Sequence, residues 1–432
     1  MANTYIKRTC DGGYTSTFTW SAWVKRSAPG NSGGLFCNKK NDSNSNSRVR
    51  FYFSSADRLA MEVKDSTGGD DSFFQTNKLF RDVNAWYNIV LAYDTTQSAE
   101  NDRIKLWINN EEVTSWEQFD RASSGFGTLW SSAMEHRIGT QNSNAGTNYY
   151  FNGSMSHIHF TYGTAYTPSA FGETDATTGE WKIKTDVSVT YGSQGYFVLK
   201  DGNSLTDQSG QSNNFTVGAG TLTKTEDCPS NVFATWNALA NQGSVPLYNG
   251  NTRAVFTASG WNFVYSTLGA SSGKYYYEVK VANGGSDSNI GIMEMDTATN
   301  EQGTADNVGK NTESVGYASN GSIKKNNVTV QTGLGSISNG EILGIAMDLD
   351  NNTVQFYLQG VSRGTAVSIA SDKTYAFATS GYGNAEHHTN FGNGYFETTA
   401  VSSAGTNASG IGIFEYDVPT GYTALSTKGL NL

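Results

Sequence analysis

One stretch in the second half of the chain constrains the fold more strongly than any other part of the sequence. Residues 341–360 read Glu-Ile-Leu-Gly-Ile-Ala-Met-Asp-Leu-Asp-Asn-Asn-Thr-Val-Gln-Phe-Tyr-Leu-Gln-Gly. Apolar residues occupy alternate positions before and after Asp350, Asn351 and Asn352, and alternate positions of an extended strand share one face. Short Asx side chains bond their own backbone and tolerate positive φ angles, which suits a turn. The pattern therefore predicts an antiparallel hairpin with one apolar side.

A hairpin of this kind requires a partner layer, because an isolated one is marginal in water. Each apolar side chain moved from water to a core contributes roughly 1.5–3 kcal/mol, whereas ordering the backbone of one residue costs about 1–2 kcal/mol. The same design occurs in residues 86–113, where apolar residues alternate over 89–93 and again over 104–108. Two such hairpins, far apart in sequence, predict two β-sandwiches in one chain.

Length and composition agree with an all-β chain of more than one domain. The chain has 432 residues, which exceeds one ordinary sandwich. Its 48 glycines and only five prolines accompany many Thr, Ser, Asn and Tyr residues, and this composition favours strands joined by many turns. No convincing helical period extends over three turns. We therefore predict two antiparallel sandwiches, of the jelly-roll or immunoglobulin-like kind, with a connecting segment.

The charge distribution argues against nucleic acid and membranes as partners. Twenty-nine basic and 39 acidic residues give a net charge of −10. Phosphate binding needs clustered Lys and Arg, but the dense basic runs are the short pairs Lys7-Arg8, Lys39-Lys40 and Lys324-Lys325. The N-terminal residues carry no apolar signal core, and no stretch is long enough to span a bilayer. We expect a soluble chain without a signal peptide.

Cys10, Cys37 and Cys228 are the three cysteines, an odd number without metal-ligand spacing. They do not build a disulfide framework. We expect a reduced protein assembled in a cytoplasm. A single bridge between two of them stays open as an alternative.

Two parts of the chain carry motifs of known domain families. Residues 273–396 contain Gly-Lys-Tyr-Tyr-Tyr-Glu-Val (273–279), Ile-Gly-Ile (290–292), Val-Gly-Tyr (315–317), the hairpin described above and Tyr-Ala-Phe (375–377), and this segment resembles a SPRY domain. The first part contains Phe-Thr-Trp-Ser-Ala-Trp-Val (18–24), Trp-Tyr-Asn-Ile-Val (86–90) and Lys-Leu-Trp-Ile-Asn (105–109), and resembles a concanavalin A-like, LamG-type sandwich. Asn109-Asn110 stands where such domains usually have Asn-Gly.

The combination of the two halves resembles virion structural proteins of marine tailed bacteriophages. Further carriers of that resemblance are Phe-Gly-Glu-Thr-Asp (171–175), Asp-Gln-Ser-Gly (207–210), Pro-Ser-Asn-Val-Phe-Ala-Thr (229–235) and Pro-Thr-Gly-Tyr-Thr-Ala-Leu (419–425). The resemblance implies a virion component of the fibre, tail or capsid exterior, and it identifies no ligand. The expected organisation begins with a LamG/concanavalin A-like sandwich over 1–175. A connecting β-segment follows over 176–245, and whether it completes the first domain is left open. A SPRY-like sandwich is expected over 246–397, and a flexible link with a C-terminal docking tail over 398–432.

Catalytic and metal chemistry have only weak candidates. Glycanases of the concanavalin A class place two carboxyl groups about 5–5.5 Å apart for retention, and the nearest match is Glu294-Met295-Asp296. Thr297 and Thr299 occupy the positions where a further carboxylate would share the strand face. We therefore predict no enzyme and no catalytic residue.

A cation site has a partial match in the turn of the organising hairpin. Asp348, Asp350 and Asn352 have the spacing of a calcium loop, but Thr353 and Gln359 stand where such a loop needs Gly and a bidentate Glu. The hairpin-turn interpretation is preferred, and Ca²⁺ at the Asx clusters of 41–46 and 69–71 stays open. The pairs His157/His159 and His387-His388 lack a third zinc ligand and are interpreted as satisfied strand or loop histidines. We predict no cofactor and no metal.

Aromatic residues in polar surroundings are the candidate contact residues. Aromatic faces stack on sugar rings and anchor protein interfaces. Six aromatic residues lie in Gly/Ser/Asn-rich surroundings and are the predicted ligand or partner contacts: Trp116, Trp130, Tyr149, Tyr150, Trp261 and Tyr382. The competing interpretation of each is a core position.

The leading hypothesis is a non-enzymatic bacteriophage virion structural protein whose lectin-like sandwiches are stiff scaffolds with recognition loops. The expected partners are other virion proteins and further copies of the chain in a homo-oligomer. Whether it contacts host surface glycans or only covers the particle is left open. Two alternatives remain: a concanavalin A-type polysaccharide depolymerase and a SPRY-type protein-binding adaptor within the virion.

Overall fold

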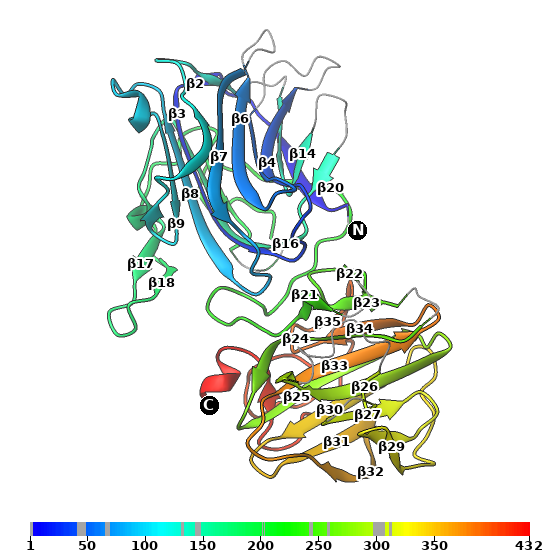
Figure 1. Ribbon diagram of the computed structural model, residues 1–432. Helices are drawn as coiled ribbons and strands as arrows, with labels where there is room; N and C mark the ends of the chain where they lie inside the picture. Colours follow the sequence, from blue (N-terminus) through cyan, green and yellow to red (C-terminus); the bar gives the residue numbers. More distant parts are fainter. Residues whose placement is uncertain are drawn as a thin grey trace. The chain divides into compact units, whose positions relative to one another are not determined.

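The computed structural model divides the chain into two compact units, Met1–Lys224 and Thr225–Leu432. Each unit is built from two large β-sheets (Figure 1). The structure describes residues 3–40, 49–64, 70–130, 134–142, 148–200, 202, 204–241, 245–256, 260–296, 307–310 and 313–432. No helix in this described part of the chain is long and apolar enough to span a membrane.

The first unit pairs an eight-stranded with a six-stranded antiparallel sheet. In spatial order, the larger sheet contains β11 (Trp116–Asp120), β7 (Asp70–Leu79), β6 (Arg58–Lys64), β5 (Val49–Phe53), β4 (Gly33–Lys40), β13 (Met134–Ile138), β1 (Tyr5–Thr9) and β20 (Thr216–Ala219). The smaller sheet contains β10 (Glu111–Glu112), β9 (Ile104–Ile108), β8 (Trp86–Asp94), β3 (Thr17–Arg26), β16 (Gly153–Tyr162) and β19 (Tyr196–Val198). Short pairs and turns complete the unit: β2 (Tyr14–Thr15) with β12 (Thr128–Leu129), β14 (Thr140–Asn142) with β15 (Asn148–Tyr150), β17 (Gly172–Thr174) with β18 (Trp181–Ile183), and the 3₁₀ turns η1 (Glu100–Asp102) and η2 (Pro168–Ala170).

The second unit has the same plan with different connections. Its seven-stranded sheet contains β21 (Trp236–Asn241), β24 (Asn262–Ala270), β33 (Tyr375–Tyr382), β26 (Asp287–Glu294), β27 (Ser314–Ala318), β28 (Ile323–Lys325) and β29 (Val328–Gln331). Its eight-stranded sheet contains β22 (Leu247–Tyr248), β23 (Arg253–Val255), β34 (Glu386–Asn390), β25 (Lys274–Asn283), β30 (Ile342–Asp348), β31 (Thr353–Leu358) and β32 (Val361–Ser368), with β37 (Thr423–Ala424) parallel to β25. The pair β35 (Tyr395–Phe396) and β36 (Thr399–Ala400) and the 3₁₀ turn η3 (Gly429–Asn431) complete it.

The organising hairpin is β30–β31, and its apolar side lies in the core of the second unit. Leu343 pairs with Leu358, Ile345 with Phe356 and Met347 with Val354. These six side chains are at most 3% exposed. Residues 89–93 and 104–108 form the equivalent pair β8–β9 in the core of the first unit. The prediction of an all-β fold with two antiparallel sandwiches is confirmed.

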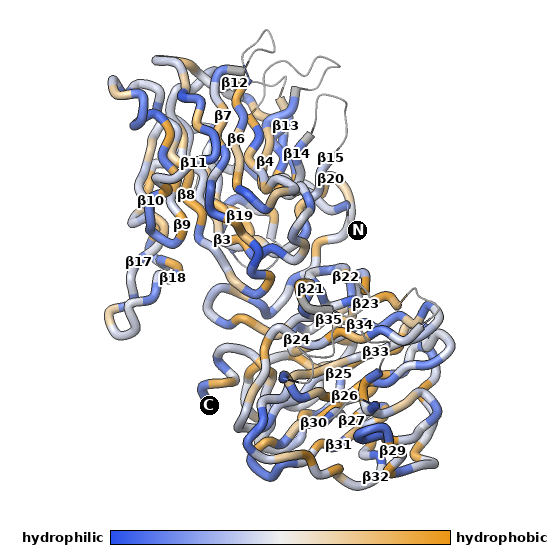
Figure 2. Tube along the Cα trace, in the orientation of Figure 1, coloured by the Kyte–Doolittle hydropathy of each residue, from blue (hydrophilic) through white to orange (hydrophobic). Residues whose placement is uncertain are grey.

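Hydrophobic segments lie along the strands of both units, interspersed with hydrophilic ones (Figure 2). The turn between β9 and β10 shows how local chemistry shapes the loops. Asn109 and Asn110 have φ angles of 51° and 70°. Because Asn tolerates this left-handed region, it replaces the usual glycine at the second turn position.

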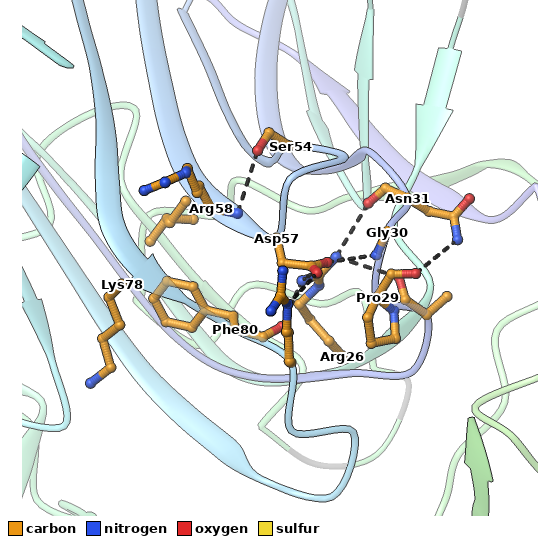
Figure 3. A network of polar contacts seen from close by, with 12 residues as sticks. Arg26, Pro29, Gly30, Asn31, Ser54, Asp57, Arg58, Lys78 and Phe80 are labelled. Atoms are coloured by element: carbon orange, nitrogen blue, oxygen red, sulfur yellow. Dashed lines mark hydrogen bonds and ion pairs between the residues drawn. The ribbon is translucent and has the colours of Figure 1, made fainter. Parts of the chain in front are cut away.

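A buried carboxylate ties three loops of the first unit together (Figure 3). Asp57 has a φ of 63° and accepts hydrogen bonds from the Arg26 guanidinium at 3.0 Å and from the Gly30 N–H at 2.6 Å. Its second oxygen accepts from Arg81 Nε at 3.0 Å. The Arg26 guanidinium also donates to the Phe80 carbonyl at 2.6 Å. The network fixes the β3–β4, β5–β6 and β7–β8 connections.

The boundary between the units falls inside the expected connecting segment 176–245. β19 pairs with β16 and β20 pairs with β1, so these strands complete the first unit. β21 pairs with β24 in the second unit. The segment 398–410, expected to be a flexible link, is folded back on the chain, because the N–H groups of Val401 and Gly405 donate to the carbonyls of Gly394 and Phe414.

All three cysteines are free. Cys10 and Cys37 are buried, and Cys228 is partly exposed. Burial raises the pKa of the Cys10 thiol to about 11. The structure therefore places no disulfide between them.

Candidate functional site

Two of the six predicted contact aromatics, Trp261 and Tyr382, come together at one end of the second unit. Trp261 directly precedes β24 and Tyr382 ends the neighbouring strand β33, with Asn262 paired to Gly381. The two rings stack with centroids 6.2 Å apart and planes inclined by 29°. Both side chains are half-buried. A half-exposed aromatic pair is a surface on which a sugar ring or an apolar side chain can pack.

A polar loop adjoins this aromatic pair. The Ser286 N–H donates to the Tyr382 carbonyl at 2.9 Å, and Asn283 Nδ2 donates to the Asn384 carbonyl at 2.9 Å. Asn283, Ser286 and Asn384 are exposed. Gly383 and Asn384 have φ angles of 63° and 68°, so Tyr382 is followed at once by a tight turn. The loops that flank Tyr382 therefore expose amide and hydroxyl groups.

A buried histidine supports this loop through hydrogen bonds. The ring nitrogens of His387 lie 2.6 Å from Thr379 Oγ1 and 2.9 Å from Ser288 Oγ. Ser288 Oγ in turn donates to the Gly284 carbonyl at 3.1 Å. Burial lowers the pKa of His387 to about 3, so its ring is neutral. Both ring nitrogens are occupied, which agrees with the interpretation of a satisfied histidine.

The other four predicted aromatics are separate from this pair. Trp130 is 1% exposed and its indole N–H donates to Thr128 Oγ1 at 2.8 Å. Its prediction as a contact residue is wrong, because the ring packs at 4.5 Å from the Phe160 ring in the core. Trp116 is half-buried at the sheet edge and stacks on Phe119 at 4.7 Å.

Tyr149 and Tyr150 are consecutive residues of β15. Tyr149 is 39% exposed, and Tyr150 packs 6.2 Å from the Tyr5 ring. Their prediction as contacts is not tested by this arrangement and stays a prediction.

Comparison with known proteins gives one family for each unit. The model of the SPRY domain matches residues 274–394, and the model of the concanavalin A-like lectin/glucanases superfamily matches residues 2–170. The chain combines a concanavalin A-like, LamG-type domain with a SPRY domain. Comparison with curated proteins gives no match.

Solved structures to which the chain is similar include two SPRY domains and a pentraxin. The SPRY domain of human HERC1 is 14% identical, covers 36% of this chain and 96% of its own, and has a TM-score of 0.30. The PSpry domain of TRIM65 is 13% identical, with coverages of 36% and 87% and a TM-score of 0.30. The native heptameric SAP-like pentraxin from Limulus polyphemus is 15% identical, with coverages of 51% and 91% and a TM-score of 0.30.

The LamG-type domain carries a cross-strand row in which five of seven residues are charged, and no sequence motif indicates it. One cross-strand row of its eight-stranded sheet joins residues from seven strands: Lys7, Arg137, Cys37, Arg50, Glu62, Phe73 and Asp120. The Arg50 guanidinium lies 5.2 Å from the Tyr52 ring and pairs with Glu62. Arg137 lies 5.0 Å from the Tyr5 ring. Because each strand contributes one residue, no local pattern in the sequence reveals the row.

The carboxylates of the SPRY domain have structural partners. Glu294 is 3% exposed and accepts the Asp296 N–H at 3.2 Å. Lys373 Nζ lies 4.0 Å from the Glu294 carboxylate. Thr297 and Thr299 lie outside the described residues. This arrangement does not test the prediction that the chain is not an enzyme.

The residues of the hairpin that have the spacing of a calcium loop stabilise its turn. Asp348 forms an ion pair with Lys274 at 2.9 Å and accepts the Asn351 N–H at 2.9 Å. Asp350 accepts the Gly273 N–H at 2.7 Å. Among the residues that the structure describes, no group of three or more His, Cys, Asp or Glu side chains could hold a metal ion. The expectation of no metal stays an expectation, and residues 41–46 and 69 lie outside the described part.

The other three histidines that were considered as zinc ligands also have partners within the protein. His159 is buried, stacks on Phe197 at 3.9 Å and lies 2.9 Å from Tyr191 Oη. His157 has a φ of 50° and lies in a bulge of β16. His388 Nε2 lies 2.7 Å from Glu386 Oε1.

Proposed function

We propose that this chain is a non-enzymatic binding protein of a tailed-bacteriophage virion. Its LamG-type and SPRY domains are of kinds that suggest binding or adaptor roles. The order of motifs along nearly the whole chain supports the virion as its location. It is assembled in the host cytoplasm, bound to other virion proteins and to further copies of itself.

The observation that carries the binding role is the Trp261–Tyr382 pair. Its two rings come from neighbouring strands and lie 6.2 Å apart beside a loop of exposed amide and hydroxyl groups. Asn283, Ser286 and Asn384 supply neutral donors and acceptors on the loops that flank Tyr382. Sugars combine a ring face that stacks on aromatics with hydroxyls that bond such groups. The proposed ligand is therefore a neutral glycan of the host surface.

The test is binding of the purified full-length chain to a glycan array, together with competition against phage adsorption to host cells. Trp261→Ala and Tyr382→Ala are expected to weaken binding at least tenfold, because each removes one stacking face. Tyr14→Ala is the matched control, since Tyr14 is 63% exposed on the other unit. Undiminished binding by both variants would refute the site, and absence of any binding or competition by the wild type would leave only a covering role.

The non-enzymatic part of the proposal has a separate test. Wild-type protein is incubated with host surface polysaccharide, and new reducing ends are measured over time. None are expected. Their appearance, and their loss in Glu294→Gln or Asp296→Asn, would instead establish a depolymerase.

A further inference from the structure

A carboxylate that hydrogen-bonds no basic side chain among the described residues lies buried under the C-terminal part of the SPRY unit. Glu278 is on β25, and its side chain points to the side opposite the core residues Tyr277 and Val279. An outward position on a sheet usually faces water. Here the residue is 0% exposed, because residues 411–418, which we call the C-terminal strap, lie over it.

Backbone groups of the strap bind the carboxylate directly. The N–H groups of Glu415 and Tyr416 donate to Glu278 Oε2 and Oε1, each at 2.9 Å. Tyr276 Oη donates at 3.3 Å, and Asn390 Nδ2 lies 3.4 Å from Oε2. Both carboxylate oxygens are therefore used, and the two shortest bonds come from the strap.

Apolar contacts reinforce the strap on both sides of this anchor. Phe414, 1% exposed, packs edge-on against Tyr276 with ring centroids 5.1 Å apart. Val418 and Ala346 belong to the same buried cluster. The strap lies beyond residue 394, where the match to the SPRY family model ends. It is therefore an addition to the domain that covers one of its sheet faces.

The titratable groups next to Glu278 and next to its partners Tyr276 and Tyr416 are acids and phenols. They are Tyr276 on its own strand, Tyr357 on β31, Glu341 before β30, and Glu415 and Tyr416 in the strap. Lys280 and its cross-strand partner His388 lie one step further along the same face. Among the described residues no basic side chain hydrogen-bonds Glu278. Burial raises the pKa of Glu278 to about 7, and the four donors offset this only in part.

We propose that Glu278 is a proton-dependent latch, which holds the strap tightly when its carboxyl is protonated and loosens it as the pH rises through neutrality. In the protonated state one carboxyl oxygen carries the proton and donates to Tyr276 Oη, so the Tyr276 hydroxyl accepts from Glu278 instead of donating to it, and the strap N–H groups keep their carboxyl acceptors. In the ionised state the same site buries a negative charge that no basic side chain among the described residues contacts, and the four hydrogen-bond donors offset the cost of that burial only in part. Lifting the strap lets water solvate that charge and uncovers Tyr276, Ala346 and Tyr357.

The sign of the effect follows from proton linkage. The docked carboxyl has a pKa of about 7, whereas exposure to water restores its ordinary value of 4.5. The docked state therefore binds the proton more tightly, and docking is favoured at low pH. Linkage makes docking about thirtyfold more favourable at pH 5.5 than at pH 8.5.

The test is amide hydrogen exchange of the full-length chain at pH 5.5, 7.0 and 8.5, expressed as protection factors that remove the intrinsic effect of pH. Protection of the Glu415 and Tyr416 amides is expected to fall about thirtyfold across this range. The core amide of Ile292 reports global unfolding in the same sample. In Glu278→Gln the decrease should vanish, whereas Glu415→Gln, which changes a neighbouring carboxyl, should keep it.

Strap protection that does not change with pH in the wild type would overturn the proposal, as would an unchanged decrease in Glu278→Gln. If Glu278→Gln fails to fold, the wild type still decides the matter. A carbon-13 titration of its glutamate carboxyls must then show one group with a midpoint near neutrality. Titration of every glutamate below pH 6 would refute the latch.

Discussion

Tyr277 and Phe377 stack across the two sheets of the SPRY domain, with ring centroids 4.0 Å apart and planes inclined by 26°. Tyr277 lies on β25 of one sheet and Phe377 on β33 of the other. The Tyr277 hydroxyl crosses the core and donates to the Gly291 carbonyl at 2.8 Å, with the Ala378 carbonyl at 3.1 Å. One side chain thus supplies both apolar contact and a polar tie between the layers.

Removing only that hydroxyl tests the polar tie. Tyr277→Phe keeps the stacked ring but leaves buried carbonyls without their donor, so we expect a loss of about 1–2 kcal/mol in the free energy of unfolding. Urea unfolding followed by circular dichroism measures it. Phe377→Leu, which disturbs the stack and keeps the hydroxyl, is the companion variant. If Tyr277→Phe is as stable as the wild type, the hydrogen bonds of the Tyr277 hydroxyl contribute nothing to stability.

The buried pair Arg26–Asp57 predicts a large effect in the LamG-type domain. Its side chains are 3% and 7% exposed. Asp57→Ala leaves the Arg26 charge buried without its partner and should cost about 3–5 kcal/mol. Arg81→Ala removes the exposed partner of the same carboxylate and should change stability by about 1 kcal/mol or less. Equal effects of the two variants would contradict the distinction.

Asp57 also predicts acid sensitivity of this domain. Burial alone would raise the pKa of Asp57, but the Gly30 N–H and the two arginines lower it below its ordinary value. A lowered folded-state pKa contributes stability above the unfolded value, and this stability is lost as the pH falls through the folded value. Calorimetry of the wild type between pH 5 and 2 should show that loss, and Asp57→Ala should show a smaller one.

His387 predicts a second acid-dependent loss, in the SPRY domain. Burial holds its pKa at about 3, whereas an unfolded histidine binds a proton below its ordinary value of 6.5. The unfolded state therefore gains protons first, and stability falls by up to about 1.4 kcal/mol per pH unit between pH 6.5 and 3. His387→Gln should lack this contribution. Unfolding curves with identical pH slopes for the two proteins would refute it.

Two tryptophans in similar sequence surroundings should respond differently to truncation. Trp130 is 1% exposed in the core, so Trp130→Ala should cost about 3–5 kcal/mol. Trp116 is half-buried at a sheet edge, so Trp116→Ala should cost distinctly less. Chemical denaturation followed by circular dichroism compares them. A larger loss for Trp116→Ala would contradict their assigned positions.

The sequence indicated several residues of the candidate site, but it did not indicate which of them lie together. Trp261 and Tyr382 were both candidates, yet nothing in the sequence paired them, since stacking depends on the register Asn262–Gly381 between two strands. Trp130 was a false candidate because its glycine- and serine-rich surroundings say nothing about the Phe160 ring that covers it. The His387–Ser288 support had no local signal at all.

The sequence by itself determined the layered β-architecture, because side-chain alternation in residues 86–113 and 341–360 is a property of the extended backbone and needs no distant contact. Only the tertiary structure decided which outward-facing groups meet water. Glu278 occupies an outward position of its strand, and its burial depends on a strap more than a hundred residues later in the chain. Burial, and with it the pKa of a carboxyl or the availability of an aromatic face, is set by neighbours that local sequence does not specify.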